Sequence, residues 1–353
     1  MHSRFHSVPP AVCLLLALCL LLAGSAAAQN APKYAVDLAW PKPLPDRWVL
    51  GGLGGVCVDN NDHVFILNRQ DILAGDLNPG KMAPPVIEMD AVGNVLHSWG
   101  DLKVLDPRLH SCAFDKENNI WVGSAPSGMI QKYTHDGSKM LLQIGKKGVV
   151  DSSDGTVKGK PLNTPGPIFF MPSSIFVDRA NGDVYVSDGE GAESDKRVAV
   201  FDRNGAFLRQ WLPDMLRVHC MTIANDGAVY VCDRDAGKIL LYDKMGKLQK
   251  SFDIPWTPAT PFADGKARDN GGAAVAFDLS RDPLQKWMYL INQQTSQVHV
   301  IERESGRIVS SFGRTGHFPG EFDQAHGIAV DSKGNIYIAE NRGRRVQKFK
   351  VVK

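Results

Sequence analysis

The chain has 353 residues, of which 43% are hydrophobic and 22% are charged, a composition typical of a soluble globular protein that excludes intrinsic disorder and a collagen-like fibre. Forty Lys and Arg residues against 38 Asp and Glu leave a formal charge of only +2. Because nucleic-acid binding depends on a basic excess, we expect no nucleic-acid partner.

The first residues predict an export signal. Arg4 gives a basic start, residues 11–23 form an apolar run, and Ala26-Ala27-Ala28 are the small residues of a cleavage site. The run is too short to span a bilayer, although a retained N-terminal anchor is the alternative. We therefore expect a signal peptide over residues 1–28 and a secreted or periplasmic mature protein without a membrane span.

One sequence motif recurs along the rest of the chain. It reads small-small-aliphatic-Ala-aliphatic-Asp, then a short polar turn, then aliphatic-aromatic-aliphatic, and its clearest copy is His326–Asp331 followed by Asn335–Asn341. Aligned on the Asp, six copies begin at these residues: Gly54, His110, Ser173, His219, Ala273 and His326. A recurring unit of this length is the signature of a repeat architecture.

Each copy is followed by further strand-like runs. The third runs cover residues 86–89, 130–133, 198–201, 239–242, 298–301 and 346–349. The fourth cover 95–99, 141–144, 207–211, 248–252 and 308–312. The fourth strand that the last unit lacks can come from residues 34–38, which can pair with 346–349. This pattern predicts an all-β fold, a single six-bladed β-propeller over residues 29–353, with insertions at 145–167 and 256–272.

Histidines occupy alternate blades at one equivalent position. A propeller places equivalent residues on a ring around its central channel, so His110, His219 and His326 would approach the axis about 120° apart. Three neutral imidazoles with an open fourth position are typical of catalytic zinc sites. Imidazole ligation alone also allows copper, iron, nickel or cobalt. The alternative is that the three residues are polar channel or buried core histidines.

Arginines occupy a second ring position, directly after the polar residue that ends the second strand of a blade. Arg69 and Arg234 lie there, and two guanidinium groups beside a metal favour a small anionic substrate gripped by its carboxylate. The alternative is that they pair with Asp71, Asp233 or Asp235.

The phrase Phe312–Asp331 resembles the NHL repeat. The contexts Leu109-His110-Ser111, Val218-His219-Cys220 and Ala325-His326-Gly327 resemble the zinc ligands of peptidyl-hydroxyglycine amidating lyase, the lyase part of peptidylglycine α-amidating monooxygenase. The resemblance implies a six-bladed propeller with zinc on these histidines and active-site arginines at Arg69 and Arg234. It also implies cleavage of a peptidyl α-hydroxyglycine into an amide and glyoxylate.

The sequence departs from this family at several positions. Glu190 follows Asp188-Gly189 where the family has its catalytic tyrosine. Glu190 is a candidate general base, and an exposed loop carboxylate is the alternative. Gln324 replaces a family methionine, Gly327 replaces an aspartate that helps to hold a structural calcium, and the family's disulfide positions are not reproduced. These departures favour related chemistry on a different substrate.

Four cysteines remain after the predicted signal: Cys57, Cys112, Cys220 and Cys232. An exported protein can keep disulfides. Cys220 and Cys232 lie symmetrically about the turn at 225–227, so a hairpin would bring them face to face. A bridge between these two and four buried thiols are both open.

Three function classes follow. The first is an exported, monomeric, metal-dependent lyase-like enzyme that acts on a small anionic or peptide-derived α-hydroxy carboxylate. The second is a non-catalytic propeller for ligand binding or protein interaction. The third is a calcium-dependent lactonase-like hydrolase. Its ligands would come from residues that are otherwise ordinary turn formers: Asn68, Asp188, Asp233, Asn292 and Glu340.

Overall fold

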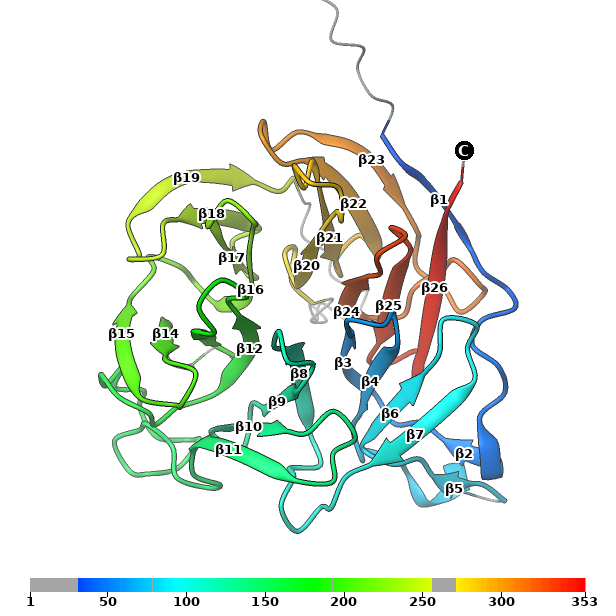
Figure 1. Ribbon diagram of the computed structural model, residues 1–353, viewed down its shortest axis with the longest axis horizontal. Helices are drawn as coiled ribbons and strands as arrows, with labels where there is room; N and C mark the ends of the chain where they lie inside the picture. The colour runs from blue at the N-terminus through cyan, green and yellow to red at the C-terminus, as the bar shows by residue number, and fades with distance from the viewer. Residues whose placement is uncertain (1–30, 78, 192, 256–270, 353) are drawn as a thin grey trace, which may run out of the picture. The chain divides into compact units, whose positions relative to one another are not determined.

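The computed structural model describes residues 31–77, 79–191, 193–255 and 271–352. The predicted signal peptide, 1–28, lies outside the described residues, as does most of the predicted insertion at 256–272. The unit over Lys33–Lys353 contains six four-stranded antiparallel sheets, here called blades 1 to 6, which surround a common centre (Figure 1). The predicted all-β six-bladed propeller is confirmed.

The strands of each blade follow one another in the chain. Blade 1 contains β3 (Leu53–Val58), β4 (Val64–Asn68), β6 (Val86–Met89) and β7 (Val95–Trp99), and blade 2 contains β8 (Leu109–Phe114), β9 (Ile120–Ser124), β10 (Met129–Tyr133) and β11 (Met140–Gly145). Blade 3 contains β12 (Pro172–Val177), β13 (Val184–Asp188), β14 (Arg197–Phe201) and β15 (Phe207–Trp211). Blade 4 contains β16 (Val218–Ile223), β17 (Val229–Asp233), β18 (Lys238–Tyr242) and β19 (Leu248–Asp253). Blade 5 contains β20 (Ala276–Leu279), β21 (Trp287–Asn292), β22 (Gln297–Glu302) and β23 (Ile308–Phe312).

Blade 6 joins the two ends of the propeller. Its strands are β24 (Ala325–Val330), β25 (Ile336–Glu340), β26 (Arg345–Val352) and β1 (Lys33–Val36). β1 pairs antiparallel with β26, with Lys33 opposite Val352 and Val36 opposite Phe349. The predicted closure by the N-terminal strand is therefore confirmed, and β1 supplies the fourth, outer strand of blade 6.

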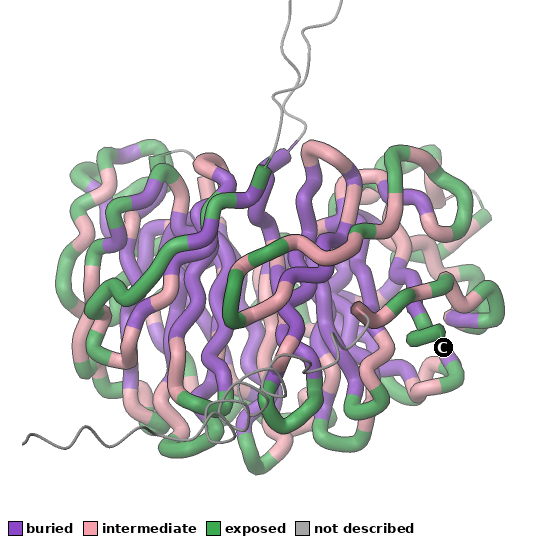
Figure 2. The backbone as a smooth tube through the Cα atoms, turned by 90° about the horizontal axis from the view of Figure 1, so that it is seen from above, coloured by how far each residue is buried: buried purple, intermediate pink, exposed green. Residues whose placement is uncertain are grey.

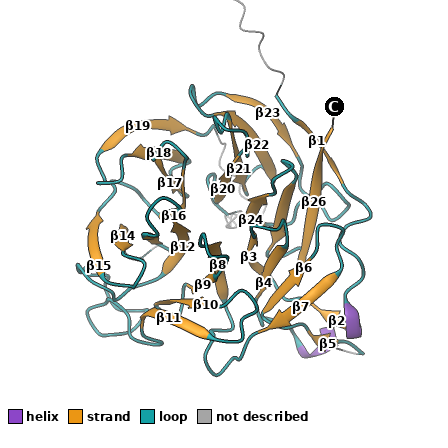
Figure 3. Ribbon diagram, in the orientation of Figure 1, coloured by secondary structure: helices purple, strands orange, loops and turns teal. Residues whose placement is uncertain are grey.

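Helix is almost absent from the described residues. Two short 3-10 segments, Pro45–Arg47 and Ala74–Leu77, lie near the small parallel pair β2 (Trp48–Val49) and β5 (Lys81–Met82) (Figure 3). Among the described residues, no helix has the length and apolar character needed to cross a membrane.

The core lies between neighbouring blades. The second strand of a blade packs on both faces, so its sequence is a continuous apolar run such as Val64-Phe65-Ile66-Leu67, and every residue of β4 is buried. Outer strands such as β19 are mostly exposed, and Figure 2 shows this gradient from buried to exposed strands. Trp121 and Ile130 of blade 2 pack in one cluster with Val186 and Phe201 of blade 3.

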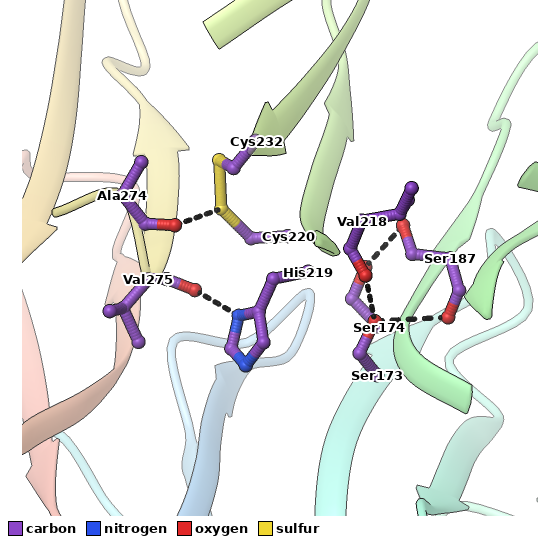
Figure 4. Close-up of a disulfide and its surroundings, with 9 residues drawn as sticks. All are labelled: Ser173, Ser174, Ser187, Val218, His219, Cys220, Cys232, Ala274 and Val275. Carbon is purple, nitrogen blue, oxygen red and sulfur yellow. Dashed lines mark hydrogen bonds between the residues drawn. A yellow bond between two sulfur atoms is a disulfide. The ribbon is translucent and has the colours of Figure 1, made fainter. Parts of the chain in front are cut away.

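Two disulfides are present. Cys220 and Cys232 bridge β16 and β17 within blade 4 (Figure 4), as one of the two sequence interpretations expected. Cys57 of β3 and Cys112 of β8 link blade 1 to blade 2, with 6.0 Å between their Cα atoms. The sequence did not predict this second pairing.

The fifth repeat is shifted by two residues from its predicted position. In blade 1 the turn residue Asp59 donates its amide to the carbonyl of His63, and in blade 5 the equivalent bond runs from Ser280 to Trp287. Asp278 lies within β20 instead. The ring position that the sequence assigned to Ala273 therefore belongs to Val275, because the alignment used the wrong residue of blade 5.

Candidate metal centre

Three histidines converge at the centre of the propeller. His110, His219 and His326 lie near the starts of β8, β16 and β24, the first strands of alternate blades. In each strand the register against the neighbouring strand shifts at the histidine. A bulge of this kind re-aims a side chain, and here it directs each imidazole toward the axis.

The three rings face one another at close range. Their centroids are 4.7 Å apart for His110 and His326, 5.4 Å for His110 and His219, and 5.8 Å for His219 and His326. One ring nitrogen of each lies within 4.8 Å of the others, a spacing that can hold a metal ion. His110 and His219 are only 5% and 3% exposed.

Backbone carbonyls of the next blades fix the tautomer of each ring. Nδ1 of His110 lies 2.6 Å from the carbonyl oxygen of Ser173, and Nδ1 of His219 lies 2.7 Å from that of Val275 (Figure 4). Nδ1 of His326 lies 2.9 Å from the carbonyl of Gly54. Because a carbonyl only accepts, each Nδ1 carries the hydrogen, and each Nε2 of a neutral ring has a free lone pair. Outer contacts of this kind orient metal-binding histidines.

Glu190 reaches the histidines. Its Oε2 lies 2.8 Å from Nε2 of His219 and 3.3 Å from Nε2 of His110. In the described part of the chain, all three atoms are buried without a hydrogen-bond partner, so their lone pairs share one space without pairing. Three imidazoles and one carboxylate with unpaired buried atoms fit a divalent metal ion. The exposed-loop interpretation of Glu190 is wrong, because only 25% of its side-chain surface is exposed.

A close approach to blade 4 brings Glu190 into place. The amides of Gly189 and Glu190 both donate to the carbonyl of Met171, at 3.0 and 2.8 Å. A β-carbon on residue 189 would lie 1.9 Å from the carbonyl oxygen of Val218. Only glycine allows this approach, which carries the following carboxylate to the axis.

The loop that carries Glu190 is anchored by Arg197, which is fully buried. Nε of Arg197 donates to Oδ2 of Asp188 at 3.1 Å and lies 3.7 Å from Oδ2 of Asp195. Oδ1 of Asp188 in turn accepts the amide of Met171 at 2.8 Å. Burial and the neighbouring Asp188 carboxylate raise the pKa of Asp195 to about 8.

The electrostatics of the centre suit metal ligation. Burial lowers the pKa of His219 and, reinforced by His110 and Arg69, lowers that of His326 well below its usual value. Burial alone would raise the pKa of Glu190, but the charge of a protonated His110 or His219 outweighs this and holds that pKa well below its ordinary range, so the carboxylate is ionised whenever a ring carries the extra proton. Neutral imidazoles and an ionised carboxylate are the forms that bind metals.

The two predicted arginines lie on the adjacent ring. Arg69 follows β4, is only 9% exposed, and donates from Nε to the carbonyl of Leu109 at 3.3 Å. Burial lowers its pKa, with Glu190 acting in the opposite direction. Nη1 of Arg234 lies 2.7 Å from Oδ1 of Asp235. Arg234 therefore pairs with an aspartate, as the alternative interpretation of the sequence expected.

Sequence reasoning did not single out Arg217. Its Nη2 lies 2.9 Å from the other oxygen of Asp235, so this carboxylate joins two guanidinium groups. The Nε of Arg217 is buried without a partner among the described residues. Its only signal in the sequence is its place two residues before His219, which no repeat highlights.

A cavity leads to the histidines from the end of the channel at which the first strands of the blades finish. It has a volume of about 610 Å³ and is lined by the first strands of the blades, from the three histidines to turn residues such as Asp178 and Lys244. This volume suits a small ligand. Because the second strands run back from these turns, Arg69 and Arg234 lie beyond the histidines, at the far end from this mouth.

The calcium alternative gains no support from the geometry. Asn68 accepts the amide of Gly51, Asp233 accepts that of Leu216, and Glu340 accepts that of Asp323. Asp188 and Asn292 hold nearby amides in the same way. These side chains therefore cap loops at their own blade ends.

The fold and the centre together define a six-bladed β-propeller with a histidine cluster that can hold a metal ion. The NHL repeat model matches residues 322–349, in the last blade. The chain is 25% identical over 342 residues to mouse NHL repeat-containing protein 3, covering 90% of this chain and 84% of that protein. It is 23% identical over 342 residues to rat peptidylglycine alpha-amidating monooxygenase.

The second similarity covers 89% of this chain but only 31% of the monooxygenase. Among solved structures, a streptogramin B lyase matches with a TM-score of 0.57 at 13% identity, covering 91% of this chain and 98% of that one. Virginiamycin B lyase from Staphylococcus aureus matches with a TM-score of 0.55 at 14% identity, covering 91% and 100%. These structural matches show the fold. The chain is thus a six-bladed propeller with an NHL repeat in its last blade and distant similarity to peptidylglycine alpha-amidating monooxygenase, while the roles of its site residues stay predictions.

Proposed function

We propose that this protein is an exported, metal-dependent lyase-like enzyme that acts on a small α-hydroxy carboxylate, such as a peptidyl α-hydroxyglycine, and releases an amide and glyoxylate. The observation that carries this proposal is the convergence of three imidazoles from alternate blades. Their Nδ1 atoms are bound to carbonyls, and the Nε2 atoms of His110 and His219 are buried without partners. Similarity to the amidating monooxygenase over nearly the whole chain supports the same chemistry.

His110, His219 and His326 would hold the metal ion, with Glu190 as a fourth donor. Zinc is the first candidate for such a set, and copper, iron, nickel and cobalt are the others. When bound, the ion supplies Lewis-acid polarisation of a substrate oxygen. Glu190 would move aside to admit the substrate oxygen.

The chain's own residues provide binding and proton transfer. A guanidinium of Arg69 or Arg234 would bind the substrate carboxylate. When the α-hydroxyl collapses to a carbonyl, the bond from carbon to the amide nitrogen breaks and its electron pair leaves with the nitrogen. Glu190 would accept the hydroxyl proton on Oε2 and return it to that nitrogen. Glu190 thus takes the place that the family gives to a tyrosine.

Two observations support export. Disulfides such as Cys57–Cys112 persist in oxidising compartments, and the similarity to an amidating monooxygenase agrees with such a location. We therefore propose that residues 1–28 are a cleaved signal and that the mature protein is a secreted or periplasmic monomer. Its partner would be a small anionic or peptide-derived molecule.

The test combines metal analysis with an assay of glyoxylate release from α-hydroxyhippurate. The wild-type protein should bind zinc at the centre and release glyoxylate. His110→Ala should lose one equivalent of metal and all activity. His317→Ala is the matched control, because His317 has 78% of its side-chain surface exposed. Full metal retention in His110→Ala would overturn the proposal.

A non-catalytic binding module is the second candidate. It is favoured by the similarity to NHL repeat-containing protein 3, which extends over 84% of that protein, whose name states no activity. It is also favoured by the ion pair between Arg234 and Asp235, which occupies a guanidinium that would otherwise bind substrate. Under this alternative, the protein would hold its metal but release no glyoxylate. Protection of the wild-type protein against heat by α-hydroxyhippurate, without turnover, would also support it.

A further inference from the structure

A second group of metal-type donors lies between blades 1 and 2, at the end of the blade 1 strands opposite the histidine centre. It contains Asp59, His63, Glu88 and His135, and one donor atom from each lies within 4.8 Å of the others. Asp59 and His63 flank the turn between β3 and β4, Glu88 lies in β6, and His135 follows β10 of the next blade. The group therefore spans the interface between two blades.

The donors meet in two short contacts. Nδ1 of His63 lies 2.7 Å from Oε1 of Glu88 and 3.9 Å from Oδ2 of Asp59. Nε2 of His135 lies 2.8 Å from the same Oδ2 of Asp59. One aspartate oxygen thus faces both imidazoles, and all four side chains point into one small space.

Surrounding contacts fix the orientation of these side chains. Oδ1 of Asp59 accepts the amides of Asn61 and His63, both at 2.8 Å, which turns Oδ2 toward the group. The ring of His135 packs edge-on against Phe65, with centroids 5.2 Å apart at 81°. Sites held on strands and packed against aromatic rings keep their geometry without a ligand.

The group contains two carboxylates that no lysine or arginine of the described residues pairs with. Asp59 and Glu88 are only 5% and 6% exposed. Within the described ranges, their side-chain partners are the imidazoles of His63 and His135 and the amides of Asn61 and Asn118, which donate to Asp59. Buried carboxylates require a cation or a proton nearby. A single divalent ion among two carboxylates and two neutral imidazoles would balance the charge.

The donor set selects the class of ion. Two nitrogens and two oxygens suit zinc and its first-row neighbours, whereas calcium prefers six or more oxygens. His63 and His135 have 30% and 31% of their side-chain surface exposed, so an ion can enter from solvent. Asp59 also lines the mouth of the central cavity.

We propose that Asp59, His63, Glu88 and His135 form a second, structural site for a divalent transition-metal ion. The ion would join blade 1 to blade 2 beside the Cys57–Cys112 disulfide, which links the same two blades. This site does not depend on the proposed lyase activity, since none of its residues touches the histidine centre.

The experiment isolates this site by removing the first. The mature chain carrying His110→Ala and His219→Ala is stripped with a chelator and titrated with Zn²⁺ by calorimetry, and bound metal is counted by mass spectrometry. One equivalent should bind, and Zn²⁺ should raise the melting temperature, because ligand that binds only the folded state stabilises it. Calcium should not compete with it.

Variants of the second site are then made in the same background. Glu88→Gln, which keeps the shape of the side chain, should weaken zinc at least tenfold, and His135→Ala should abolish the equivalent. His317→Ala is the control, since 78% of the His317 side-chain surface is exposed and His317 is not one of the four donors. Circular dichroism checks that each variant folds.

Two results would overturn the proposal. The first is absence of zinc uptake at 100 µM by the folded double-histidine variant, which would leave only a hydrogen-bonded network. The second is that Glu88→Gln and His135→Ala both still bind one equivalent of zinc with the affinity of the parent variant. Neither result bears on the histidine centre, so the two proposals fail or stand separately.

Discussion

The histidine centre and the group around Asp59 use the same donor types but are connected in different ways. In the centre, backbone carbonyls of the next blades occupy the Nδ1 atoms, so the Nε2 atoms of His110 and His219 and the Glu190 oxygen remain without partners. In the Asp59 group, the imidazoles donate directly to the carboxylates. The backbone hydrogen bonds therefore leave the donor atoms of the first site unpaired. In the second site, the donor atoms hydrogen-bond to one another when no ion is bound.

Removing Arg197 gives the largest expected loss of stability, because its guanidinium pairs with two buried aspartates. Arg197 supports the loop of the histidine centre and has no contact with the Asp59 group. Arg197→Met leaves the buried carboxylates of Asp188 and Asp195 without their guanidinium. The free energy of unfolding should fall by about 3–5 kcal/mol. Chemical denaturation measures this, with the exposed Arg307→Met as control.

The same variant should also displace Glu190, since Asp188 holds the Met171 segment that binds the Glu190 amide. The metal affinity of the centre should therefore fall while that of the Asp59 group stays unchanged. Equal losses at both sites would show that the two regions are coupled through the fold.

Neutralising Glu190 gives a smaller effect on the centre alone. Glu190→Gln keeps the size of the side chain but removes the negative charge beside His110 and His219. Zinc affinity should fall about tenfold, since three imidazoles remain. Calorimetry measures the change, and Glu193→Gln in the same loop is the control. An unchanged affinity would mean that Glu190 is not a donor.

The last effect concerns pH and is spread over several pH units. The pKa of Asp195 is raised to about 8 in the folded protein, above its unfolded value near 3.8, so the native state keeps a proton that the unfolded state loses. This stabilisation is complete at low pH and is lost as the pH rises toward 8, by at most about 1.4 kcal/mol per pH unit.

Asp195→Asn should flatten this dependence between pH 4 and 8. Melting temperatures recorded across that range measure it, with the exposed Asp214→Asn as control. A slope equal to that of the wild-type protein would exclude Asp195 as its source.

The repeat pattern predicted the blades and the alternate histidines because residues at equivalent positions of the repeats lie at equivalent positions around the ring. It failed in blade 5, where Asp278 lies in β20 and pairs with Arg281 at 2.6 Å instead of closing the turn. It also gave no signal for Cys57–Cys112, since contacts between blades depend on how the sheets pack. The position of Glu190 depends on the clearance at Gly189, which no pattern of residue types reveals.

The closure of blade 6 has a consequence for biosynthesis. His326 belongs to the blade that needs both β1 and β26, the two ends of the propeller. During synthesis, β1 stays unpaired until β26 has been made. His326 lies in β24, far along the chain from His110 and His219, so a partly synthesised chain that ends before blade 6 cannot bring all three imidazoles together.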